Sequence, residues 1–266
     1  MPATTQARAG TSDMKREPIL ACRDMRMEFR RFAAVDGVSL DVAQGDIHAL
    51  IGPNGAGKTT CFNLLTKFLT PSAGTIMFNG KDITRSRPAD VARLGLVRSF
   101  QISAVFDKLS TLHNVRIALQ RREGDSFAFW QSEDRLRRFD DEAMELLRSV
   151  GLETMARTRA SELSYGRKRA LELATTLATE PKMLLLDEPM AGMAPEDIGR
   201  MSDLIRVAAK GRTVLMVEHN LSVVSALASR ITVLARGKVL AEGDYATISA
   251  DPRVVESYIG GGTHHD

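Results

Sequence analysis

Hydrophobic and polar positions alternate along the first structured part of the 266-residue chain, from about residue 20 to residue 52. This period of two predicts β-strands, and the pairs Asp36-Gly37 and Gln44-Gly45 predict turns between them. The last of these strands, IHALIG (47–52), runs directly into a glycine-rich segment. A strand that leads into glycines marks a place where the backbone itself can form a site.

The spacing of apolar residues then changes twice. A helix is predicted over KTTCFNLLTKFL (58–69), followed by a strand over 74–83 that contains an Asn79-Gly80 turn. Residues 102–162 are charge-rich and helix-periodic, and from residue 182 onward short apolar strands alternate with helices. Strands that alternate with helices predict a largely parallel sheet, so the chain has an α/β core interrupted by a helical insertion.

Composition narrows the class of protein. Hydrophobic residues make up 44% and charged residues 26% of the chain. The net charge is +3, and no block of Lys and Arg with aromatic residues between them occurs, so nucleic acid is not an expected partner. No apolar run approaches a membrane span, and residues 1–18 lack the apolar core of a signal peptide, so we expect a cytoplasmic chain with a disordered N-terminal tail. Cys22 and Cys61 fit no metal or disulfide pattern and are expected to be buried thiols.

The segment GPNGAGKTT (52–60) has the spacing of a phosphate-binding loop. Its three glycines let successive N–H groups point inward as an anion nest, and the helix that follows adds its positive N-terminal end. Lys58 is suited to reach the β- and γ-phosphates, and the hydroxyl of Thr59 is suited to ligate Mg²⁺. The nucleotide-binding residues predicted here are Gly52, Pro53, Asn54, Gly55, Ala56, Gly57, Lys58, Thr59 and Thr60.

Two later strands end in polar residues. The apolar strand KMLLLDEP ends in Asp187 and Glu188, and TVLMVEHN ends near His219. Ligands of doubly wound sheets bind at the carboxyl ends of the strands. We therefore expect Asp187 to help hold Mg²⁺, Glu188 to orient the attacking water, and His219 to lie near the γ-phosphate.

Five segments stand in one order along the chain: the phosphate loop, RSFQ (98–101), LSYGR (163–167), LLLDEP (184–189) and VEHN (217–220). Together they resemble the nucleotide-binding ATPase subunit of ABC transporters, and LSYGR looks like the signature motif of that family. The resemblance covers about residues 20–260 and implies an α/β fold: a P-loop NTPase core with a mostly parallel sheet, an antiparallel β subdomain and a helical insertion. The implied division is a tail at 1–18, one ATPase domain at 19–260 (core and β subdomain at 19–101 and 163–260, helical subdomain at 102–162), and a tail at 261–266.

The resemblance also implies roles for single residues. Gln101 matches the glutamine that contacts Mg²⁺ and the attacking water. Phe29 matches the aromatic residue that stacks on adenine, and this role is favoured over the alternative that Phe29 packs in the core. Ser164 and Gly166 match residues that touch the γ-phosphate of an ATP bound to a second subunit. The expected cofactors are ATP and Mg²⁺; the expected catalytic residues are Lys58, Gln101, Glu188 and His219, and the expected metal-binding residues are Thr59, Gln101 and Asp187.

A narrower resemblance rests on the segments 49–63, 163–181, 184–197 and 242–260, which are similar to ATPases of branched-chain (hydrophobic) amino-acid importers. It implies ATP hydrolysis coupled to transmembrane transport, with the chain peripheral on the inner face of the plasma membrane. The implied partners are a second ABC ATPase subunit, identical or different, membrane permease subunits and, indirectly, a solute-binding protein. Related ATPases serve urea, short amides or aromatic acids, so the solute stays open, and import follows from the resemblance alone.

Two residues depart from the family pattern. Arg167 replaces the usual glutamine of the signature, and Ala194 replaces an Asp or Asn that normally crosses the dimer interface. The second change puts in doubt how tightly the two sites of a dimer are coupled. The segment after Gln101 carries Phe106, Leu109 and Leu112, which either line a groove for a helix of the membrane subunit or belong to the core of the helical subdomain.

Other functions fit the sequence less well. A soluble ABC ATPase of a non-transport machine would usually carry two cassettes or long coiled coils, and this chain has neither. The LSYGR segment argues against a P-loop kinase, and the lack of an N-K-x-D motif argues against a GTPase.

Overall fold

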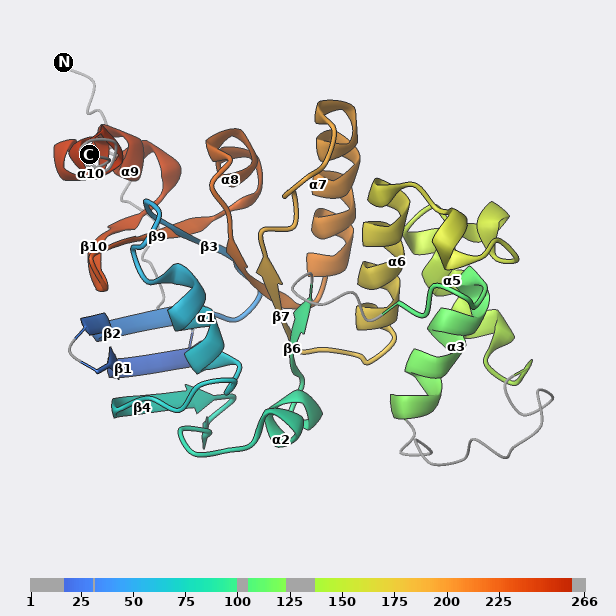
Figure 1. Cartoon of the computed structure of the whole chain (residues 1–266), viewed down its shortest axis with the longest axis horizontal. Helices are drawn as coiled ribbons and strands as arrows, with labels where there is room; N and C mark the ends of the chain where they lie inside the picture. Colours follow the sequence, from blue (N-terminus) through green and yellow to red (C-terminus); the bar gives the residue numbers. More distant parts are fainter. Residues whose placement is uncertain (1–16, 31, 100–104, 123–136, 260–266) are drawn as a thin grey trace, which may run out of the picture.

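The computed structural model describes residues 17–30, 32–99, 105–122 and 137–259. Within these ranges one sheet has six strands in the order β10-β9-β3-β8-β7-β6, all parallel except β10 (Figure 1). Its strands are β3 (Ile47–Ile51), β6 (Leu96–Ser99), β7 (Met183–Asp187), β8 (Thr213–Val217), β9 (Arg230–Ala235) and β10 (Lys238–Gly243). The carboxyl ends of β3, β8 and β7 therefore lie side by side.

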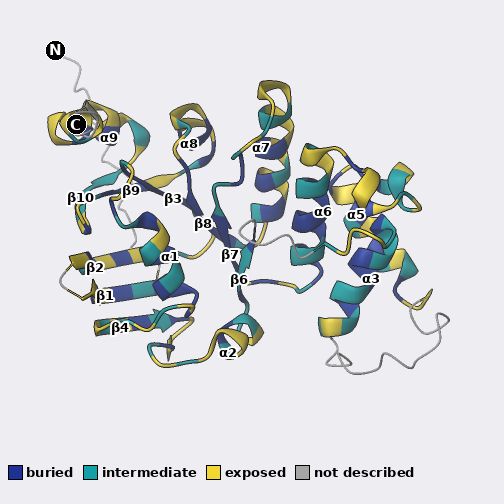
Figure 2. Ribbon diagram, viewed as in Figure 1, coloured by how far each residue is buried: buried dark blue, intermediate teal, exposed yellow. Residues whose placement is uncertain are grey.

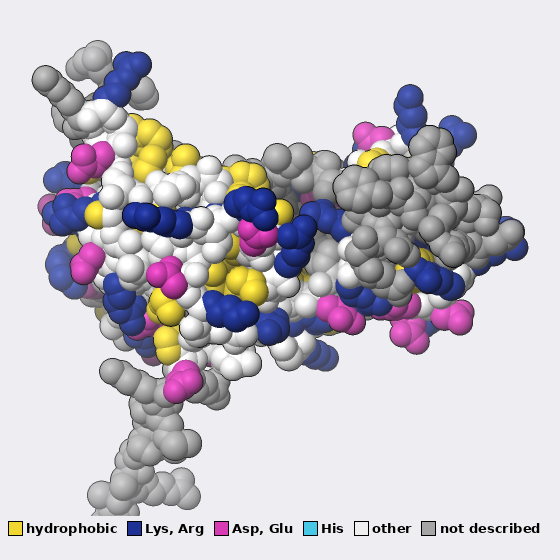
Figure 3. Space-filling model, turned by 90° about the horizontal axis from the view of Figure 1, so that it is seen from below, with side chains coloured by type: hydrophobic (Ala, Val, Ile, Leu, Met, Phe, Trp, Pro, Cys, Tyr) yellow, Lys and Arg dark blue, Asp and Glu magenta, His cyan; other side chains and the backbone are white. Residues whose placement is uncertain are grey.

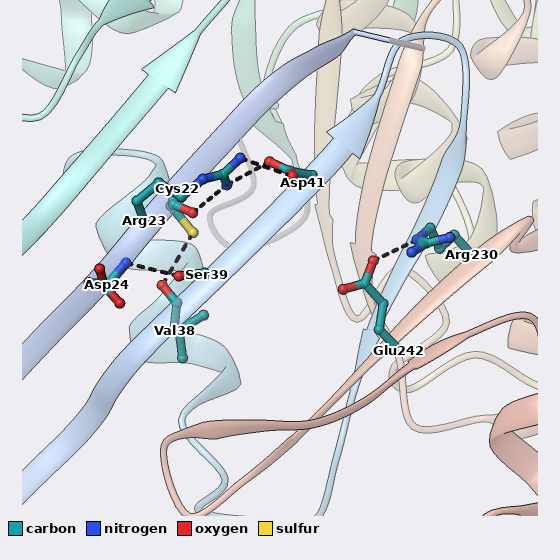
Figure 4. Close-up of polar contacts among 8 residues, drawn as sticks. All are labelled: Cys22, Arg23, Asp24, Val38, Ser39, Asp41, Arg230 and Glu242. Atoms are coloured by element: carbon teal, nitrogen blue, oxygen red, sulfur yellow. Dashed lines mark hydrogen bonds and ion pairs between the residues drawn. The ribbon is translucent and has the colours of Figure 1, made fainter. Parts of the chain in front are cut away.

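A second sheet of the described residues has four antiparallel strands in the order β2-β1-β4-β5. They are β1 (Pro18–Phe29), β2 (Phe32–Ala43), β4 (Ala73–Phe78) and β5 (Lys81–Asp82). Between β1 and β2, Arg23 Nη1 donates to Asp41 Oδ1 at 2.6 Å, and in the other sheet Arg230 Nε donates to Glu242 Oε1 at 2.5 Å (Figure 4). These contacts tie neighbouring strands at exposed positions.

The helices cover the six-stranded sheet on both faces. The chain forms α1 (Lys58–Leu65), α2 (Pro88–Arg93), α3 (Thr111–Arg122), α5 (Asp140–Ser149), α6 (Tyr165–Leu177), α7 (Pro195–Ala209), α8 (Leu221–Leu227), α9 (Tyr245–Ala250) and α10 (Pro252–Ile259). Two short 3₁₀ helices are η1 (Glu153–Met155) and η2 (Ala160–Glu162). Alternate residues of the central strands enter two different cores, with Leu185 on the α1 face and Leu184 and Leu186 on the face of α6, α7 and α8. Both faces are buried, as Figure 2 shows for β3, β7 and β8, which explains their continuous apolar sequences.

A third core joins α3, α5 and α6, at the side of the molecule opposite the small sheet (Figure 1). Its buried residues include Val115, Leu147 and Leu171. The α/β class with a mostly parallel sheet, an antiparallel β subdomain and a group of helices is thus confirmed. The predicted domain boundaries stay a prediction, and most of the two predicted tails lies outside the described residues.

Two local predictions were wrong. The Asp36-Gly37 pair is not a turn but lies inside β2, where the pairing with β1 shifts between Met25–Val38 and Arg26–Asp36. Gly37 has φ +75°, so it is the extra residue of a β-bulge, and turns and bulges favour the same residue types. The helix predicted over 58–69 ends at Leu65, because Lys67 adopts φ +66°.

Both cysteines of the chain are buried. Cys22 Sγ donates to the carbonyl oxygen of Val38 at 3.7 Å (Figure 4). Burial raises the pKa of the Cys22 thiol to about 12 and also raises the pKa of Cys61. The expectation of buried thiols is confirmed.

On the face shown in Figure 3, Lys and Arg side chains are scattered among Asp and Glu with small apolar groups between them. None of the helices among the described residues combines the length and the apolar character that a membrane crossing requires.

Candidate functional site

The phosphate loop connects β3 to α1, and its glycines are required by close backbone contacts. Gly52 has φ +148°, and a Cβ there would lie 2.1 Å from the carbonyl oxygen of Leu234. Gly57, the residue before α1, has φ +100°, and a Cβ there would lie 2.4 Å from the carbonyl oxygen of Ala34. The loop is therefore held between β9 and β2, and side chains at these two positions would push it out of place.

Lys58 begins α1 and turns its ammonium back onto the loop. Its Nζ donates to the carbonyl oxygens of Gly52 at 2.7 Å and Pro53 at 2.9 Å. Burial lowers the pKa of Lys58, and the negative charge of Glu188 opposes part of that change. The structure thus brings a buried cation of the loop within electrostatic reach of the acid that follows β7.

The other predicted loop residues differ in exposure. Asn54, Gly55 and Thr59 are exposed, and Pro53 and Thr60 are half-buried, whereas Ala56 is buried and its carbonyl oxygen accepts from the N–H of Gly237 at 3.0 Å. Ala56 thus anchors the loop to the turn between β9 and β10, and the exposed hydroxyl of Thr59 is open to a ligand.

Asp187 ends β7 and forms a buried ion pair that the sequence did not predict. Arg98 Nη2 donates to Asp187 Oδ2 at 2.5 Å, and Arg98 Nη1 donates to Asn63 Oδ1 at 2.6 Å. The two charged side chains are 6% and 12% exposed, so the pair is largely shielded from water. Arg98 lies on β6, and it belongs to the RSFQ segment, where only Gln101 was given a role. Gln101 itself lies outside the described residues.

Glu188 has a left-handed backbone, with φ +47°. Its N–H donates to the carbonyl oxygen of Val217 on β8 at 3.0 Å, and its own carbonyl oxygen accepts from the N–H of Ala191 at 3.0 Å. A residue with a side chain costs about 1 kcal/mol or more in this conformation and persists only where its surroundings hold it. Such strain is typical of functional sites, and it falls on the residue predicted to orient water.

Glu218 is a second residue that the sequence did not predict to act. It is fully buried, and its carboxylate accepts from the N–H of Met190 at 3.1 Å, of His219 at 3.0 Å and of Asn220 at 3.2 Å. The carboxylate therefore ties the turn after Glu188 to the loop that carries His219. An acid inside an apolar strand end was the available signal, because a buried charge needs such partners.

His219 follows Glu218 and is exposed, with its side chain at the end of β8. Phe29 is 45% exposed at the end of β1, where it pairs with Phe32. Exposure leaves both rings available to a ligand, as their predicted roles require.

The signature segment, Leu163–Arg167, lies at the start of α6. Ser164 is the N-cap residue of α6, but its exposed side chain makes no capping hydrogen bond. A Cβ on Gly166 would lie 2.9 Å from Asp197 Oδ2 in the first turn of α7. The segment therefore packs against the start of α7, while the Ser164 side chain faces outward; Figure 1 shows α6 and α1 well apart.

The structure thus gathers the phosphate loop, Asp187, Glu188 and His219 at the ends of the neighbouring strands β3, β7 and β8. It places Ser164 and Gly166 on a different element. Such an arrangement can bind a nucleotide and position water. A phosphate bound to the loop would, however, lie away from the signature segment of the same chain.

Comparisons with known proteins show the family and the fold of the chain. The family described as ABC transporter matches residues 35–191, and the family described as branched-chain amino acid ATP-binding cassette transporter matches residues 238–264. The chain is 36% identical, over 251 residues, to the high-affinity branched-chain amino acid transport ATP-binding protein LivG of Salmonella typhimurium, covering 92% of this chain and 98% of LivG. It is 37% identical, over 253 residues, to the corresponding protein BraF of Pseudomonas aeruginosa, covering 91% and 98%. A crystal structure of an ATP-binding cassette of an ABC transporter in its ADP conformation matches with a TM-score of 0.80 and 34% identity, covering 91% and 99%.

Proposed function

The chain belongs to the ABC transporter family and is an ATP-hydrolysing cassette of that family, and from this premise we propose that it powers an importer of branched-chain amino acids or related small solutes. The observation that supports the substrate class is the match of residues 238–264 to the branched-chain amino acid cassettes, together with near full-length relatives of that kind. The alternative of a non-transport machine finds no such support.

At the ATP site we propose that the phosphate loop N–H groups and Lys58 hold the β- and γ-phosphates. Glu188 orients the water for in-line attack on the γ-phosphorus; the bond to the β,γ-bridging oxygen breaks, and ADP and phosphate leave. His219 lies where it can donate to the γ-phosphate, and Gln101 is assigned to the same water. The influence of the Glu188 charge on the pKa of Lys58 supports this assignment.

The donor set is compatible with Mg²⁺ shared between the chain and its nucleotide. The described residues contain no cluster of three or more His, Cys, Asp or Glu that could hold a metal alone. Mg²⁺ in such sites takes one or two protein oxygens and completes its shell with phosphates and water. Thr59 and Asp187 would supply protein oxygens, and the ion would neutralise charge on the phosphates.

We propose that the working form is a head-to-tail dimer with a second cassette, in which Ser164 and Gly166 touch the γ-phosphate bound to the partner. The exposed Ser164 side chain and the separation of α6 from α1 support this. The dimer would sit on membrane permease subunits at the inner face of the plasma membrane. Phe106, 54% exposed, is the proposed permease contact, whereas Leu112 is partly buried against the third core.

The test is Glu188→Gln, compared with Glu145→Gln, an exposed glutamate on α5. The first variant should hydrolyse ATP at least about 10²-fold more slowly, because water loses its orienting group, and should accumulate ATP-dependent dimers. In cells, the same variant should lose uptake of labelled leucine, with urea and an aromatic acid as alternative solutes. Near-normal hydrolysis by Glu188→Gln would contradict the assigned role, and unchanged leucine uptake would contradict the substrate class.

A further inference from the structure

Tyr165, the first residue of α6, connects the signature segment to the loop after β7. Its hydroxyl donates to the carbonyl oxygen of Ala191 at 2.9 Å. The Tyr165 hydroxyl oxygen itself accepts from Arg169 Nε at 3.1 Å and from Arg169 Nη2 at 2.8 Å. A guanidinium has only donors, so these bonds leave the hydroxyl proton to point at Ala191. The direction of the Tyr165–Ala191 bond is therefore fixed by Arg169.

Arg169 is itself held in place. Its Nη1 donates to Glu172 Oε2 at 3.0 Å, and these side chains are 13% and 6% exposed. Its Cζ lies 5.2 Å from the centre of the Tyr165 ring. Tyr165 is 47% exposed, yet its hydroxyl is hydrogen-bonded to Arg169, which belongs to a largely buried ion pair with Glu172. This support gives the exposed tyrosine one defined position.

Ala191 belongs to the same turn as Glu188. The Ala191 N–H donates to the Glu188 carbonyl oxygen, while the Ala191 carbonyl oxygen accepts from Tyr165. The N–H and the carbonyl group of Ala191 thus connect the backbone of Glu188 to Tyr165 at the start of α6. Gly192 follows directly, and a Cβ there would lie 3.4 Å from Tyr165 Oη, so the loop runs closely over the hydroxyl.

We propose that Tyr165 is a positioning residue for Glu188 of its own chain. The inference rests on the proposed function, in which Glu188 acts on the ATP of its own phosphate loop and Ser164 and Gly166 touch the ATP of the partner. Tyr165 connects the signature segment to Glu188. The position of α6 against the partner's ATP therefore sets the position of Glu188 at the ATP of its own chain. Ala194 offers no polar group for this connection, and the Tyr165 hydroxyl provides one within the chain.

Tyr165→Phe removes the hydroxyl and keeps the ring. We expect kcat for ATP hydrolysis to fall about tenfold, the size typical of one lost hydrogen bond in a polar network, with KM for ATP within about twofold. The matched control is Tyr245→Phe on α9, where the ring packs against the second core. Thermal unfolding of both variants checks that the fold is kept. A wild-type kcat for Tyr165→Phe would overturn the proposal.

Mixed dimers, assembled from two differently substituted copies of this chain, distinguish positioning from a general effect on the signature. In the first, one subunit carries Tyr165→Phe and the other Glu188→Gln, so the remaining Glu188 lies in the chain that lacks the hydroxyl. In the second, one subunit carries both changes and the other is wild type, so the remaining Glu188 lies in a chain with Tyr165 intact. We expect the first dimer to be about tenfold slower than the second.

Equal rates in the two dimers would overturn the proposal, because Tyr165 would then act only through the fold. A slower second dimer would also overturn it, because Tyr165 would then act through its signature segment on the partner's ATP. Failure of the proposed function is seen separately, as a wild-type chain that hydrolyses no ATP before any substitution. That result would remove the inference along with its premise.

Discussion

The phosphate loop lies within the fold, whereas the signature segment lies largely on its surface. Gly52 and Gly57 leave no space for a side chain, and Lys58 is 9% exposed. Ser164 and Arg167, in contrast, are exposed at the start of α6. The two regions are proposed to meet on one nucleotide, yet only the first is positioned by the core of its own chain.

This difference separates two kinds of sensitivity. Changes near the phosphate loop disturb packing, so they should alter stability together with activity. Changes at the exposed positions of the signature segment, Ser164 and Arg167, meet solvent in the single chain, so they should alter activity and leave the stability of the chain unchanged. Two substitutions test this separation, beginning with the largest expected effect, and a third tests the start of α7, against which the signature segment packs.

Ser164→Arg is expected to lower ATP hydrolysis by about 10²-fold, the size found when one group that contacts transition-state charge is lost. The long side chain would occupy the place of the partner's phosphate. The free energy of unfolding should change by less than about 0.5 kcal/mol, as for other exposed sites. Steady-state hydrolysis and urea unfolding measure the two quantities, with the exposed Ser161→Arg as control. Normal, concentration-dependent hydrolysis would contradict the role of Ser164.

His48 tests the opposite region, because it lies on β3, the strand that leads into the phosphate loop. It is fully buried, its Nε2 lies 2.8 Å from Thr232 Oγ1, and burial, assisted by the charge of Arg230, lowers its pKa from 6.5 to about 4. As pH falls from 6.5 toward 4, His48 therefore binds a proton in the unfolded chain but not in the folded chain. Between pH 7 and pH 5 the free energy of unfolding should drop by about 2 kcal/mol from this residue alone.

The measurement is urea unfolding at both pH values for the wild type and for His48→Gln. Other titrating groups are common to the two chains, so the difference between their pH dependences isolates His48. Identical pH dependences would show that His48 is not the source.

Ala194→Asn has the smallest expected effect. Ala194 is the N-cap residue of α7, exposed and without a side-chain cap. Asparagine would accept from a free N–H of the first turn and avoid the negative charges of Glu196 and Asp197. The free energy of unfolding should rise by about 1 kcal/mol, measured by thermal unfolding against Ala194→Gly. A loss of stability would indicate that the loop before α7 is packed too tightly for a cap.

Elements with a strong local signal could be predicted from the sequence. The apolar strands before Gly52 and Glu188 are buried on both faces, and Asn79 and Gly80 adopt the positive φ values of a tight turn. The Asp36-Gly37 pair was misjudged because a bulge and a turn need the same freedom of φ. Burial and pairing with a neighbouring strand decide between them, and neither is local.

The connections within the candidate site could not be predicted, because they join segments far apart in the chain. Arg98 meets Asp187 across 89 positions, and Glu218 meets Met190 across 28. The motifs identified which residues end each strand but not which partners hold them. Tyr165 lies inside a recognised motif, and its contact with Ala191 still depends on how α6 lies against the loop after β7.

Both cysteine thiols of the chain are buried, so the protein is suited to site-specific labelling at an introduced cysteine. A thiol reacts as its anion, and burial with raised pKa values keeps Cys22 and Cys61 in the unreactive form near neutral pH. Oxidants and alkylating reagents should therefore not react with Cys22 or Cys61 in the native chain. A single cysteine placed on the exposed signature segment would carry a fluorophore or spin label alone, and its signal would report the approach of a second subunit.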